Sequence, residues 1–487
     1  MMPTTTGRQR MTRQHIEAAP VTVDGRDLST SDVFGVVNPA TGEVFAHAPS
    51  VGADQLDHVF GTSLRAFESW KDDETARRAV LHAAADRLES AADELAPVLT
   101  AEQGKPLPEA RDEITRSAMW LRYYADLEVP REIIRDDAEA YQEVVRRPLG
   151  VVTAITPWNF PVLLALWKIA PALRAGNTVV VKPSPYTPLS LLAVGRVLRE
   201  ALPPGVLNVI SGPEPLGAAA VAHPIPRKVS FTGSTVVGRE VGIAAAADFK
   251  RVTLELGGND PAIVLGDVDI DRIAPTLFWS AFVNNGQMCL AAKRVYAHHS
   301  IHAGLVEAMA ALAKSVVVED GMVPGAQLGP LNNLPQYERV KDLVRDAVRH
   351  GARVAAGGAP LDREGYFHQP TVLSEVTDGI RVVDEEQFGP VMPIIAFGDE
   401  ADAVQRANNS AYGLTASVWS ADPERAYALA ATMDSGQVSV NVHGGAVMPT
   451  LPFGGRKNSG IGVENGLWGL HSFSDPQAVA GPPRKRS

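Results

Sequence analysis

Cys289 is the only cysteine in a chain of 487 residues, and it directly follows the run Gly286-Gln287-Met288. A lone cysteine is most often a small buried apolar residue, although a cysteine thiolate is also a strong nucleophile. The glycine ahead of Cys289 permits a tight backbone, which can leave a main-chain N–H free to stabilise an oxyanion. With no second cysteine the chain forms no internal disulfide, which fits a reducing compartment.

Two other segments carry polar side chains that suit acyl chemistry. The run Glu255-Leu256-Gly257-Gly258 places a carboxylate at the end of a predicted strand; the alternative is a surface acid before a turn. The run Thr156-Pro157-Trp158-Asn159-Phe160-Pro161 holds an amide between two prolines that restrict the backbone. Asn159 is therefore either an aimed hydrogen-bond donor or part of a proline-rich packing turn.

A fourth segment suits phosphate binding. The run Phe231-Thr232-Gly233-Ser234-Thr235 is typical of a strand that leads into a helix, and Gly238 follows it. Helix N-termini present unpaired N–H groups and the positive end of the helix dipole, and small residues let a phosphate approach them. The run is not a GxGxxG motif, and alone it also describes an ordinary strand–turn–helix connection.

The elements that must position these residues alternate between Gly150 and Leu256, where short β-rich runs separate longer apolar helical stretches. The predicted strands are Val151–Thr156, Thr178–Val181, Val206–Ile210, Lys228–Phe231 and Val252–Leu254. The predicted helices include Val162–Arg174 and Leu189–Leu202, which stop before Gly176-Asn177 and Pro204-Gly205. This alternation predicts a mostly parallel sheet that binds ligands beyond the carboxyl ends of its strands.

A second α/β set follows a boundary that we predict near Gly257-Gly258. Its predicted helices are Leu277–Asn284, Leu305–Lys314 and Arg339–His350, and its predicted strands are Val295–His298, Ser417–Trp419 and Val438–Val440. The stretch Ala53–Asp126, ahead of the first sheet, is predicted to be mainly helical. The fold class is therefore α/β.

Composition and charge exclude several classes of protein. The 45% hydrophobic and 21% charged residues are ordinary for a globular protein. The net charge of -11 argues against nucleic-acid binding, and no apolar run approaches the roughly 20 residues that cross a bilayer. We expect a cytoplasmic protein without nucleic-acid or membrane partners. The segment Met1–Gln14 has three arginines but no apolar stretch, so it is not a secretory signal; a disordered tail, an upstream start and a transit peptide stay open.

Taken together, these segments resemble the aldehyde dehydrogenase superfamily, in its NAD(P)-dependent, hydrolytic, non-acylating branch. Further segments that carry the resemblance are Asn38–Glu43, Gly176–Pro183, Glu386–Val391 and Pro452–Gly460, so it extends over nearly the whole chain. The resemblance implies a Rossmann-like parallel-sheet cofactor domain, a second α/β catalytic domain and a small β oligomerisation arm. The implied division is 1–127 with 148–256 for NAD(P) binding, 257–465 for catalysis, and 128–147 with 466–487 for the arm and the C-terminal tail.

The resemblance also implies a role for each matching catalytic position. Cys289 would attack the aldehyde carbon to give a thiohemiacetal, whose oxyanion the Asn159 amide and the Cys289 main-chain N–H would hold. Hydride would then pass to the nicotinamide, and Glu255 would activate the water that hydrolyses the thioester to a carboxylic acid. Glu464 resembles a second carboxylate that is sometimes assigned to proton relay, and it ranks below Glu255. No metal ligand is implied.

For the cofactor, the resemblance implies NAD, with NADP possible. Lys182 would bond the adenine-side ribose, while Gly233 and Ser234 would bond the pyrophosphate. Glu386 would bond the nicotinamide ribose, with Phe388 packed beside it. The remaining nucleotide contacts implied are Trp158, Ser184, Gly238 and Leu256.

Pro185 departs from the family pattern. Many NAD-preferring relatives have Glu there, and its carboxylate binds the ribose hydroxyls and repels the extra phosphate of NADP. Because Pro185 carries no charge, we expect that NAD is used and NADP is tolerated. Asn259, where relatives often carry Lys, is a second departure, to which we attach no consequence.

The identity of the aldehyde and the oligomeric state stay open. Four bulky residues are candidates to line the substrate pocket and favour an apolar or aromatic aldehyde: Trp167, Phe282, Met288 and Phe453. The resemblance implies a homodimer or homotetramer, in which subunits exchange an arm near Ala138–Arg147 and the segment Phe473–Val479.

Three alternatives compete with this reading of the function. The first is a coenzyme-A-acylating relative, against which Glu255 argues. The second is a cysteine hydrolase that pairs Cys289 with one of twelve histidines, although no local histidine motif accompanies the cysteine. The third is a protein that has kept the fold and lost the chemistry.

Overall fold

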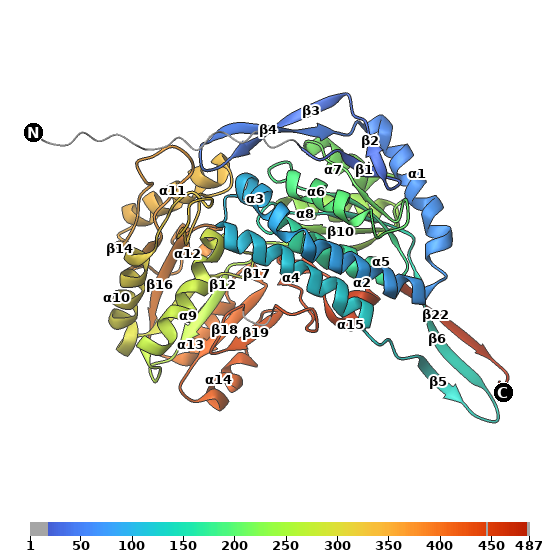
Figure 1. Ribbon diagram of the computed structural model, residues 1–487. Helices are drawn as coiled ribbons and strands as arrows, with labels where there is room; N and C mark the ends of the chain where they lie inside the picture. Colours follow the sequence, from blue (N-terminus) through green and yellow to red (C-terminus); the bar gives the residue numbers. More distant parts are fainter. Residues whose placement is uncertain (1–17, 445–446, 485–487) are drawn as a thin grey trace, which may run out of the picture.

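Two large sheets form the framework of the chain in the computed structural model, which describes residues 18–444 and 447–484 (Figure 1). The first sheet has the order β2-β1-β9-β8-β7-β10-β11-β21. Its five central strands are parallel: β7 (Val151–Ile155), β8 (Thr178–Lys182), β9 (Leu207–Val209), β10 (Lys228–Thr232) and β11 (Arg251–Glu255). Antiparallel strands extend it: β1 (Val21–Val23), β2 (Arg26–Leu28) and β21 (Gly460–Ile461).

All five predicted strands of this sheet are confirmed, with ends that differ by at most one residue. They are buried almost throughout, as expected for parallel strands covered by helices on both faces. The helices between them are α5 (Pro161–Arg174), α6 (Leu189–Leu198), α7 (Glu214–Ala222) and α8 (Thr235–Ala247). The predicted end of α6 at Leu202 was wrong: the helix ends at Leu198, ahead of Pro203 and Pro204, which cannot continue it.

The predicted helical stretch before this sheet is confirmed as four helices: α1 (Ala53–Trp70), α2 (Glu74–Ser90), α3 (Ala92–Gln103) and α4 (Leu107–Asp126). Helix α4 packs alongside α5 (Figure 1), so residues of α4 lie close to the start of α5. A two-stranded ribbon of β3 (Asp32–Asn38) and β4 (Glu43–Ser50) precedes the helices. The strands predicted from the sequence do not include this ribbon.

The second sheet has the order β14-β15-β16-β13-β12-β18-β19 and is parallel except for the pair β14–β15. Its strands are β12 (Asp260–Val264), β13 (Ala292–His298), β14 (Arg353–Ala356), β15 (Thr371–Ser374), β16 (Val391–Phe397), β18 (Thr415–Trp419) and β19 (Gln437–Val440). Its helices are α9 (Ile270–Phe282), α10 (His299–Ser315), α11 (Leu334–Arg349), α12 (Arg381–Asp384), α13 (Glu400–Asn408) and α14 (Pro423–Ala430). Short β17 (Tyr412–Gly413) pairs with β20 (Arg456–Lys457). The predicted boundary at Gly257-Gly258 falls between β11 and β12.

The segment just before Cys289 differs from its prediction. Helix α9 ends at Phe282 and does not continue to Asn284, and a 3₁₀ turn follows over Val283–Gly286. Three consecutive residues adopt the left-handed conformation, with φ of 51° at Asn284, 57° at Asn285 and 67° at Gly286. Asparagine and glycine tolerate this conformation better than other residues, and a right-handed helix cannot pass through it. The turn therefore redirects the chain immediately ahead of the cysteine.

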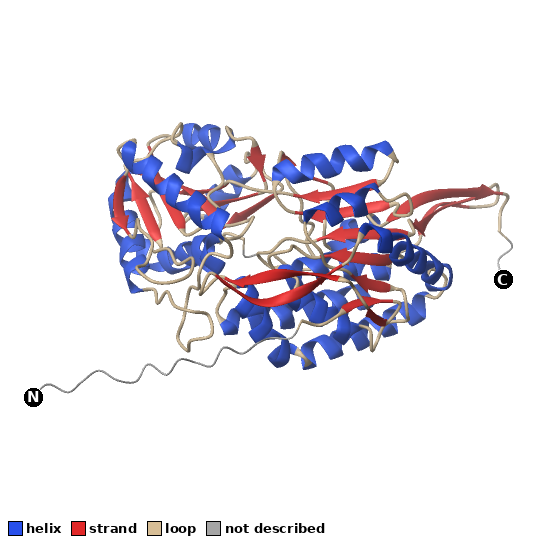
Figure 2. Cartoon of the chain, turned by 90° about the horizontal axis from the view of Figure 1, so that it is seen from above, coloured by secondary structure: helices blue, strands red, loops and turns tan. Residues whose placement is uncertain are grey.

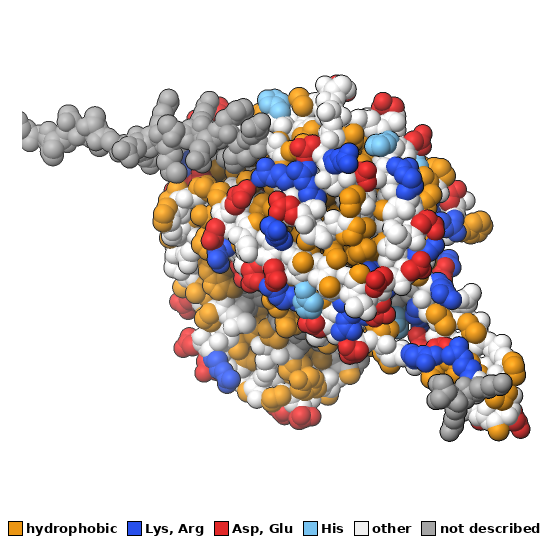
Figure 3. Space-filling model, turned by 45° about the vertical axis from the view of Figure 1, so that its right-hand side comes forward, with side chains coloured by type: hydrophobic (Ala, Val, Ile, Leu, Met, Phe, Trp, Pro, Cys, Tyr) orange, Lys and Arg blue, Asp and Glu red, His pale blue; other side chains and the backbone are white. Residues whose placement is uncertain are grey.

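A three-stranded antiparallel arm projects from the body of the molecule (Figures 1 and 2). It consists of β5 (Glu132–Asp136), β6 (Tyr141–Pro148) and β22 (Ser474–Gly481), which follows the short helix α15 (Gly466–His471). The arm joins the two segments that the resemblance assigns to it. Apolar side chains on the arm face outward, with Ile134 68% exposed, and Figure 3 shows hydrophobic atoms gathered there.

Among the described residues, none of the helices combines the length and apolar character needed to span a membrane. The same residues contain no group of three or more His, Cys, Asp or Glu side chains that could hold a metal ion. The predictions about Met1–Gln14 lie outside the described residues.

Candidate active site

Three cavities meet at the carboxyl ends of the first sheet. The α8 cavity, of about 420 Å³, lies between the N-terminus of α8, Glu255, Cys289 and Glu386. The Lys182 cavity, of about 630 Å³, shares Trp158, Gly233 and Ser234 with it and so continues it toward β8. The α5 cavity, of about 530 Å³, lies between α4, α5 and α9. Cys289 and Asn159 line both the α8 and the α5 cavities, so they stand where the two spaces meet.

Cys289 is half-buried at this junction. Burial raises the pKa of its thiol well above the ordinary value, and the nearby charge of Glu255 raises it further. Lys293 acts in the opposite direction. The thiol is therefore protonated in the ligand-free protein at neutral pH.

Glu255 ends β11 and is 2% exposed. Neither of its carboxylate oxygens has a hydrogen-bond partner among the described residues. Burial raises the pKa of Glu255 to about 8, with a further contribution from the charge of Glu464, while Lys168 and the Cys289 thiol lower it. A buried carboxyl with a pKa near the working pH and no committed partner is suited to accept a proton.

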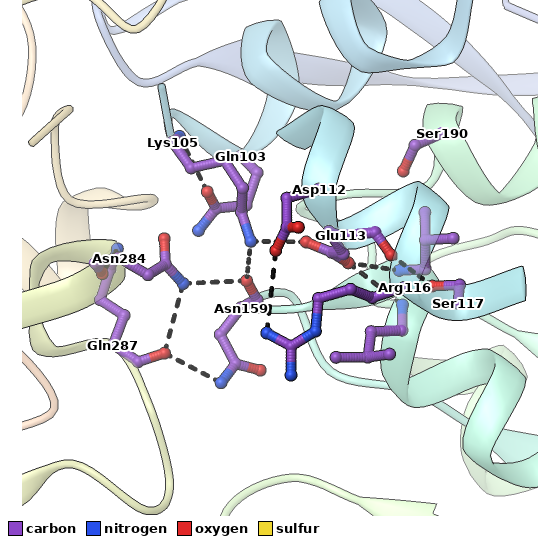
Figure 4. A network of polar contacts seen from close by, with 12 residues as sticks. Gln103, Lys105, Asp112, Glu113, Arg116, Ser117, Asn159, Ser190, Asn284 and Gln287 are labelled. Atoms are coloured by element: carbon purple, nitrogen blue, oxygen red, sulfur yellow. Dashed lines mark hydrogen bonds and ion pairs between the residues drawn. The ribbon is translucent and has the colours of Figure 1, made fainter. Parts of the chain in front are cut away.

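The side chain of Asn159 is oriented by the segment that carries the cysteine (Figure 4). Its Nδ2 donates to the main-chain oxygen of Gln287 at 2.9 Å, which uses one of the two amide hydrogens. No described residue accepts from the other amide hydrogen, and Asn159 lines both cavities together with Cys289. Its amide oxygen Oδ1 likewise has no hydrogen-bond partner among the described residues.

A buried network holds the main chain of Asn159 from the opposite side (Figure 4). The Asn159 carbonyl oxygen accepts from Lys105 Nζ and from Asn284 Nδ2, each at 2.9 Å. Lys105 Nζ also lies 2.6 Å from Glu113, and the two side chains are 0% and 1% exposed. Glu113 accepts two main-chain N–H groups in the first turn of α5, at 2.9 and 3.1 Å. Helix α4, the start of α5 and the left-handed turn together fix where Asn159 stands.

The residues predicted to bind the nucleotide phosphates lie at the start of α8. Ser234 is the N-cap of α8, and its Oγ accepts from the main-chain N of Val237 at 3.3 Å. Gly233 and Ser234 line both the α8 and the Lys182 cavities. Gly238 is buried against Leu256, whose side chain lies 2.2 Å from the place a Cβ would occupy. Gly238 therefore allows α8 to pack closely, and its predicted nucleotide contact stays a prediction.

The predicted ribose-binding residues lie in two places. Lys182 ends β8 and lines the Lys182 cavity with Ser184, and burial lowers its pKa while Glu214 opposes that shift. Glu386 lines the α8 cavity, where its Oε1 accepts from the main-chain N of Gly258 at 3.1 Å. These two residues occupy opposite ends of the joined cavities.

The other predicted residues complete the wall of the α8 cavity. Trp158 and Phe388 line it and meet edge to face, with ring centroids 5.3 Å apart, and Leu256 lies beside them. The two glycines after Leu256 make close approaches possible. A Cβ at Gly257 would lie 2.3 Å from Glu386 Oε2, and one at Gly258 would lie 2.8 Å from the Cys289 carbonyl oxygen.

Glu464 lies behind Glu255 and does not appear among the residues that line the three cavities. It is 4% exposed and forms a buried ion pair with Lys168. Ser230 Oγ lies 3.4 Å from the same carboxylate oxygen. Glu464 therefore acts on Glu255 through its charge.

Two of the four residues predicted to line a substrate pocket, Trp167 and Met288, line the α5 cavity. Phe282 and Phe453 do not line it, because both are buried in the core: Phe282 stacks on Phe278 at 4.4 Å, and Phe453 packs behind Trp167 at 5.3 Å. Further lining residues that the sequence did not indicate are Leu163, Leu164, Trp279, Val283, Leu290 and Val447.

Several residues that shape the site escaped the sequence analysis. Lys105 and Glu113 belong to a helical stretch without a motif, and nothing in their spacing indicates that they meet beneath Asn159. Asn284 carried a usable signal, because the run Asn284-Asn285-Gly286 favours left-handed backbone and contradicts a continuous helix. Lys293 lies four residues after Cys289, and its contacts could not be foreseen without the sheet.

Comparison with known proteins decides the family. Residues 27–479 match the model of the aldehyde dehydrogenase family. The chain belongs to this family. A phenylacetaldehyde dehydrogenase of Pseudomonas fluorescens is 39% identical over 474 residues, which cover 93% of each chain. A succinate-semialdehyde dehydrogenase (NADP(+)) of Escherichia coli strain K12 is 36% identical, with 92% of this chain and 94% of the relative covered. The solved NAD+ complex of an aldehyde dehydrogenase from Bacillus cereus is 35% identical and matches with a TM-score of 0.93, covering 99% of this chain and 100% of the other.

Membership fixes the class of reaction. Aldehyde dehydrogenases oxidise aldehydes to carboxylic acids, and solved relatives bind NAD+ while a curated relative is named for NADP(+). The protein is therefore an NAD(P)-dependent oxidoreductase that acts on aldehyde groups. The predicted α/β fold class and the predicted family are both confirmed.

Proposed function

We propose that this aldehyde dehydrogenase oxidises an apolar, preferably aromatic, aldehyde with Cys289 as the nucleophile, Asn159 as the oxyanion donor and Glu255 as the general base. One observation carries the assignment: Cys289 and Asn159 line both the α8 and the α5 cavities. A sulfur at such a junction can meet an aldehyde from one side and a nicotinamide ring from the other.

The α8 and Lys182 cavities suit a dinucleotide. The N-terminus of α8 offers main-chain N–H groups and a positive dipole end to a pyrophosphate. Lys182 and Glu386 provide a ribose donor and a ribose acceptor at the two ends. The absence of a Cβ at Gly257 leaves the Glu386 carboxylate open to the cavity. When NAD(P) is bound here, it supplies the acceptor for the hydride.

The chemistry of the chain itself then follows from the geometry. The Glu255 carboxylate accepts the proton of the Cys289 thiol and later releases it to solvent. The thiolate adds to the aldehyde carbon, and the carbonyl oxygen becomes an oxyanion that accepts from the free Asn159 N–H and the Cys289 main-chain N–H. Loss of hydride from that carbon leaves a thioester on Cys289. The Glu255 carboxylate takes a proton from water as its oxygen attacks the thioester, and the carboxylic acid leaves as the thiolate is regenerated. The negative charge of Glu464 raises the pKa of Glu255 and so keeps this base partly protonated near neutral pH.

The lining of the α5 cavity supports an apolar substrate. Aromatic and aliphatic side chains form most of its wall around Cys289, among them Phe160, Trp167 and Trp279. The relative from Pseudomonas fluorescens is named for phenylacetaldehyde, which such a wall would accept. Arg116 is the one basic residue in the lining, and its Nη1 lies 3.7 Å from Asp112, with Glu109 also in the wall. This acidic surplus disfavours a substrate with a free carboxylate, such as the succinate semialdehyde named for the Escherichia coli relative.

NAD is proposed as the cofactor, with NADP tolerated. Pro185 and Tyr186 line the Lys182 cavity, and neither carries a charge that would repel a ribose phosphate. Glu214 lines the same cavity and is exposed to solvent, so its repulsion of such a phosphate is screened. Discrimination against NADP is therefore weak.

The division into domains, the assembly and the location complete the proposal. Residues 1–127 with 148–256 form the nucleotide-binding domain, 257–465 the catalytic domain, and 128–147 with 466–487 the arm and tail. The exposed apolar side chains of the arm, Ile133, Ile134 and Val479, support a homodimer or homotetramer in which a neighbouring subunit covers them. The single cysteine, which forms no internal disulfide, supports a cytoplasmic location.

The test is nucleotide reduction followed at 340 nm over a panel of aldehydes, with NAD and NADP side by side. We expect the highest kcat/KM for phenylacetaldehyde and related aryl aldehydes, a much lower value for succinate semialdehyde, and turnover with both nucleotides. Cys289→Ala should abolish reduction. Turnover by that variant would overturn the assignment of the nucleophile, and a preference for succinate semialdehyde would overturn the substrate class.

A further inference from the structure

Lys293 is a buried cation that the chemistry above does not use. It is the second residue of β13, and its side chain is 3% exposed. Its Nζ donates to the main-chain oxygen of Cys289 and lies 3.2 Å from Glu386 Oε1. The ammonium group also lies 5.8 Å from the centre of the Phe388 ring. Lys293 therefore connects the segment of the nucleophile to the residue assigned to the nicotinamide ribose.

The charges that face Cys289 come from four elements. Glu255 at the end of β11, Asp260 at the start of β12 and Glu386 after α12 are acidic, and each disfavours a thiolate. Lys293 on β13 is the positive charge that acts against them. His443, which lines the α5 cavity, is neutral because burial lowers its pKa to about 3.

Partial protonation reduces the negative charge around Cys289 without removing it. Burial raises the pKa of Glu255 to about 8 and that of Asp260 to about 7, so near neutral pH both carry less than a full negative charge. The ion pair of Lys168 with Glu464 stands behind Glu255 and is neutral overall. The stability of a Cys289 thiolate therefore depends on Lys293, whose ammonium group donates to the Cys289 main-chain oxygen.

We propose that Lys293 is a positioning residue that stabilises the Cys289 thiolate and transmits nucleotide binding to it through Glu386. The inference rests on the proposed roles of Cys289 and Glu386. In the ligand-free protein, Glu386 Oε1 is shared between Lys293 and the Gly258 N–H. Ribose hydroxyls that donate to the same carboxylate compete with the ammonium group for it. The charge of Lys293 is then less neutralised by Glu386 and acts more strongly on the sulfur.

The chain offers a clean readout, because Cys289 is its only thiol. Alkylation by iodoacetamide, followed by intact-protein mass across a pH series without nucleotide, reports the thiolate of this residue alone. In Lys293→Met we expect the midpoint of the pH profile to rise by about one unit, so that alkylation at neutral pH slows roughly tenfold. Lys293→Arg should restore most of the rate. Lys341→Met, at a partly exposed ion pair in α11, is the matched control and should leave the profile unchanged.

The double variant Lys293→Met/Glu386→Gln separates charge from structure. It removes a pair that is neutral overall, so the midpoint should return toward that of the unmodified protein. If Lys293 only held the main chain of Cys289 as a hydrogen-bond donor, Lys293→Gln, which keeps a donor and loses the charge, would react as fast as the unmodified protein, and the proposal would be wrong. An unchanged midpoint in Lys293→Met would overturn it as well.

The coupling to nucleotide is tested with ADP-ribose, which carries the second ribose but no nicotinamide ring. We expect saturating ADP-ribose to speed alkylation of the unmodified protein and to have no such effect on Lys293→Met. Equal effects on both proteins, or none on the unmodified protein, would refute the coupling. These outcomes are independent of turnover by Cys289→Ala, so failure of this inference and failure of the proposed nucleophile are distinguishable.

Discussion

The ion pair between Lys105 and Glu113 makes a prediction that separates stability from catalysis. Glu113→Gln keeps the shape of the side chain and an oxygen for the two N–H groups of α5, but it leaves the ammonium of Lys105 buried without a counter-charge. Removing one partner of a buried pair costs about 3–5 kcal/mol. We expect the midpoint of thermal unfolding to fall clearly. Glu200→Gln, which breaks an exposed pair with Arg87, is the matched control and should change stability by under about 1 kcal/mol.

The double variant Lys105→Met/Glu113→Gln removes both charges. The double variant leaves no unpaired charge in the interior, so much of the lost stability should return. The Asn159 carbonyl oxygen nevertheless loses its bond of 2.9 Å from Lys105 and keeps only the one from Asn284. Loss of a complete oxyanion donor costs about 10²–10³ in kcat. If the Asn159 amide is still present but less well oriented, we expect kcat to fall by about tenfold to a hundredfold.

The assays are differential scanning fluorimetry for stability and nucleotide reduction at 340 nm with an aryl aldehyde for kcat and KM. We expect kcat to stay low in the double variant while stability recovers, and KM to change less than kcat. Of the residues that line the α5 cavity, only Glu113 is altered, and Gln keeps the shape of its side chain. Recovery of kcat in step with stability would refute the view that Lys105 positions Asn159. It would instead assign the pair to folding alone.

Three further predictions concern the base, the turn and the cofactor. The pKa of Glu255 is about 8 and its carboxylate is the active form, so the hydrolytic step should speed up roughly tenfold from pH 7 to 9. Glu255→Gln should remove this rise and leave a burst of reduced nucleotide before slow turnover. A flat profile for acyl-enzyme hydrolysis in the unmodified protein would contradict it. Asn284→Gly keeps the left-handed conformation but loses the bond to Asn159, so kcat should fall severalfold while stability changes little; unchanged kcat would show that this bond is dispensable. Glu214→Gln should raise the ratio of kcat/KM for NADP to kcat/KM for NAD by a few-fold, and Pro185→Glu should lower this ratio. If both variants keep the ratio of the unmodified protein, neither position lies near the ribose phosphate.

The sheet and the residues at its edge were predictable for one physical reason. Strands that are buried on both faces are continuous apolar runs, which the sequence shows clearly at Thr178–Lys182. Parallel strands direct their carboxyl ends to the same edge, so Glu255 and the loop that carries Asn159 had to lie near each other. Their meeting with Cys289, which comes from the second α/β set, was implied by the family resemblance alone.

The parts that could not be predicted depend on contacts between distant segments. Phe282 and Phe453 are bulky enough to line a pocket, yet packing against Phe278 and Trp167 draws both into the core. An apolar residue carries no signal that distinguishes the wall of a cavity from the interior behind it. The left-handed turn at Asn284 was misjudged because apolar periodicity outweighed the asparagines, which were the better guide.

Three Lys–Glu pairs of the described residues surround the site, two of them fully buried and the third with its glutamate partly exposed to the α8 cavity, and each lies next to a different predicted functional group. Lys105 with Glu113 supports Asn159, Lys168 with Glu464 lies behind Glu255, and Lys293 with Glu386 touches the segment of Cys289. Buried ion pairs gain little stability over apolar packing, so these pairs around one junction are poorly explained by folding. A pair that is neutral overall adds no net charge to the interior. A functional group that lies closer to one partner than to the other nevertheless feels the electric field of that partner. That property suits a reaction in which the donor, the base and the nucleophile must each be tuned separately within a few ångströms.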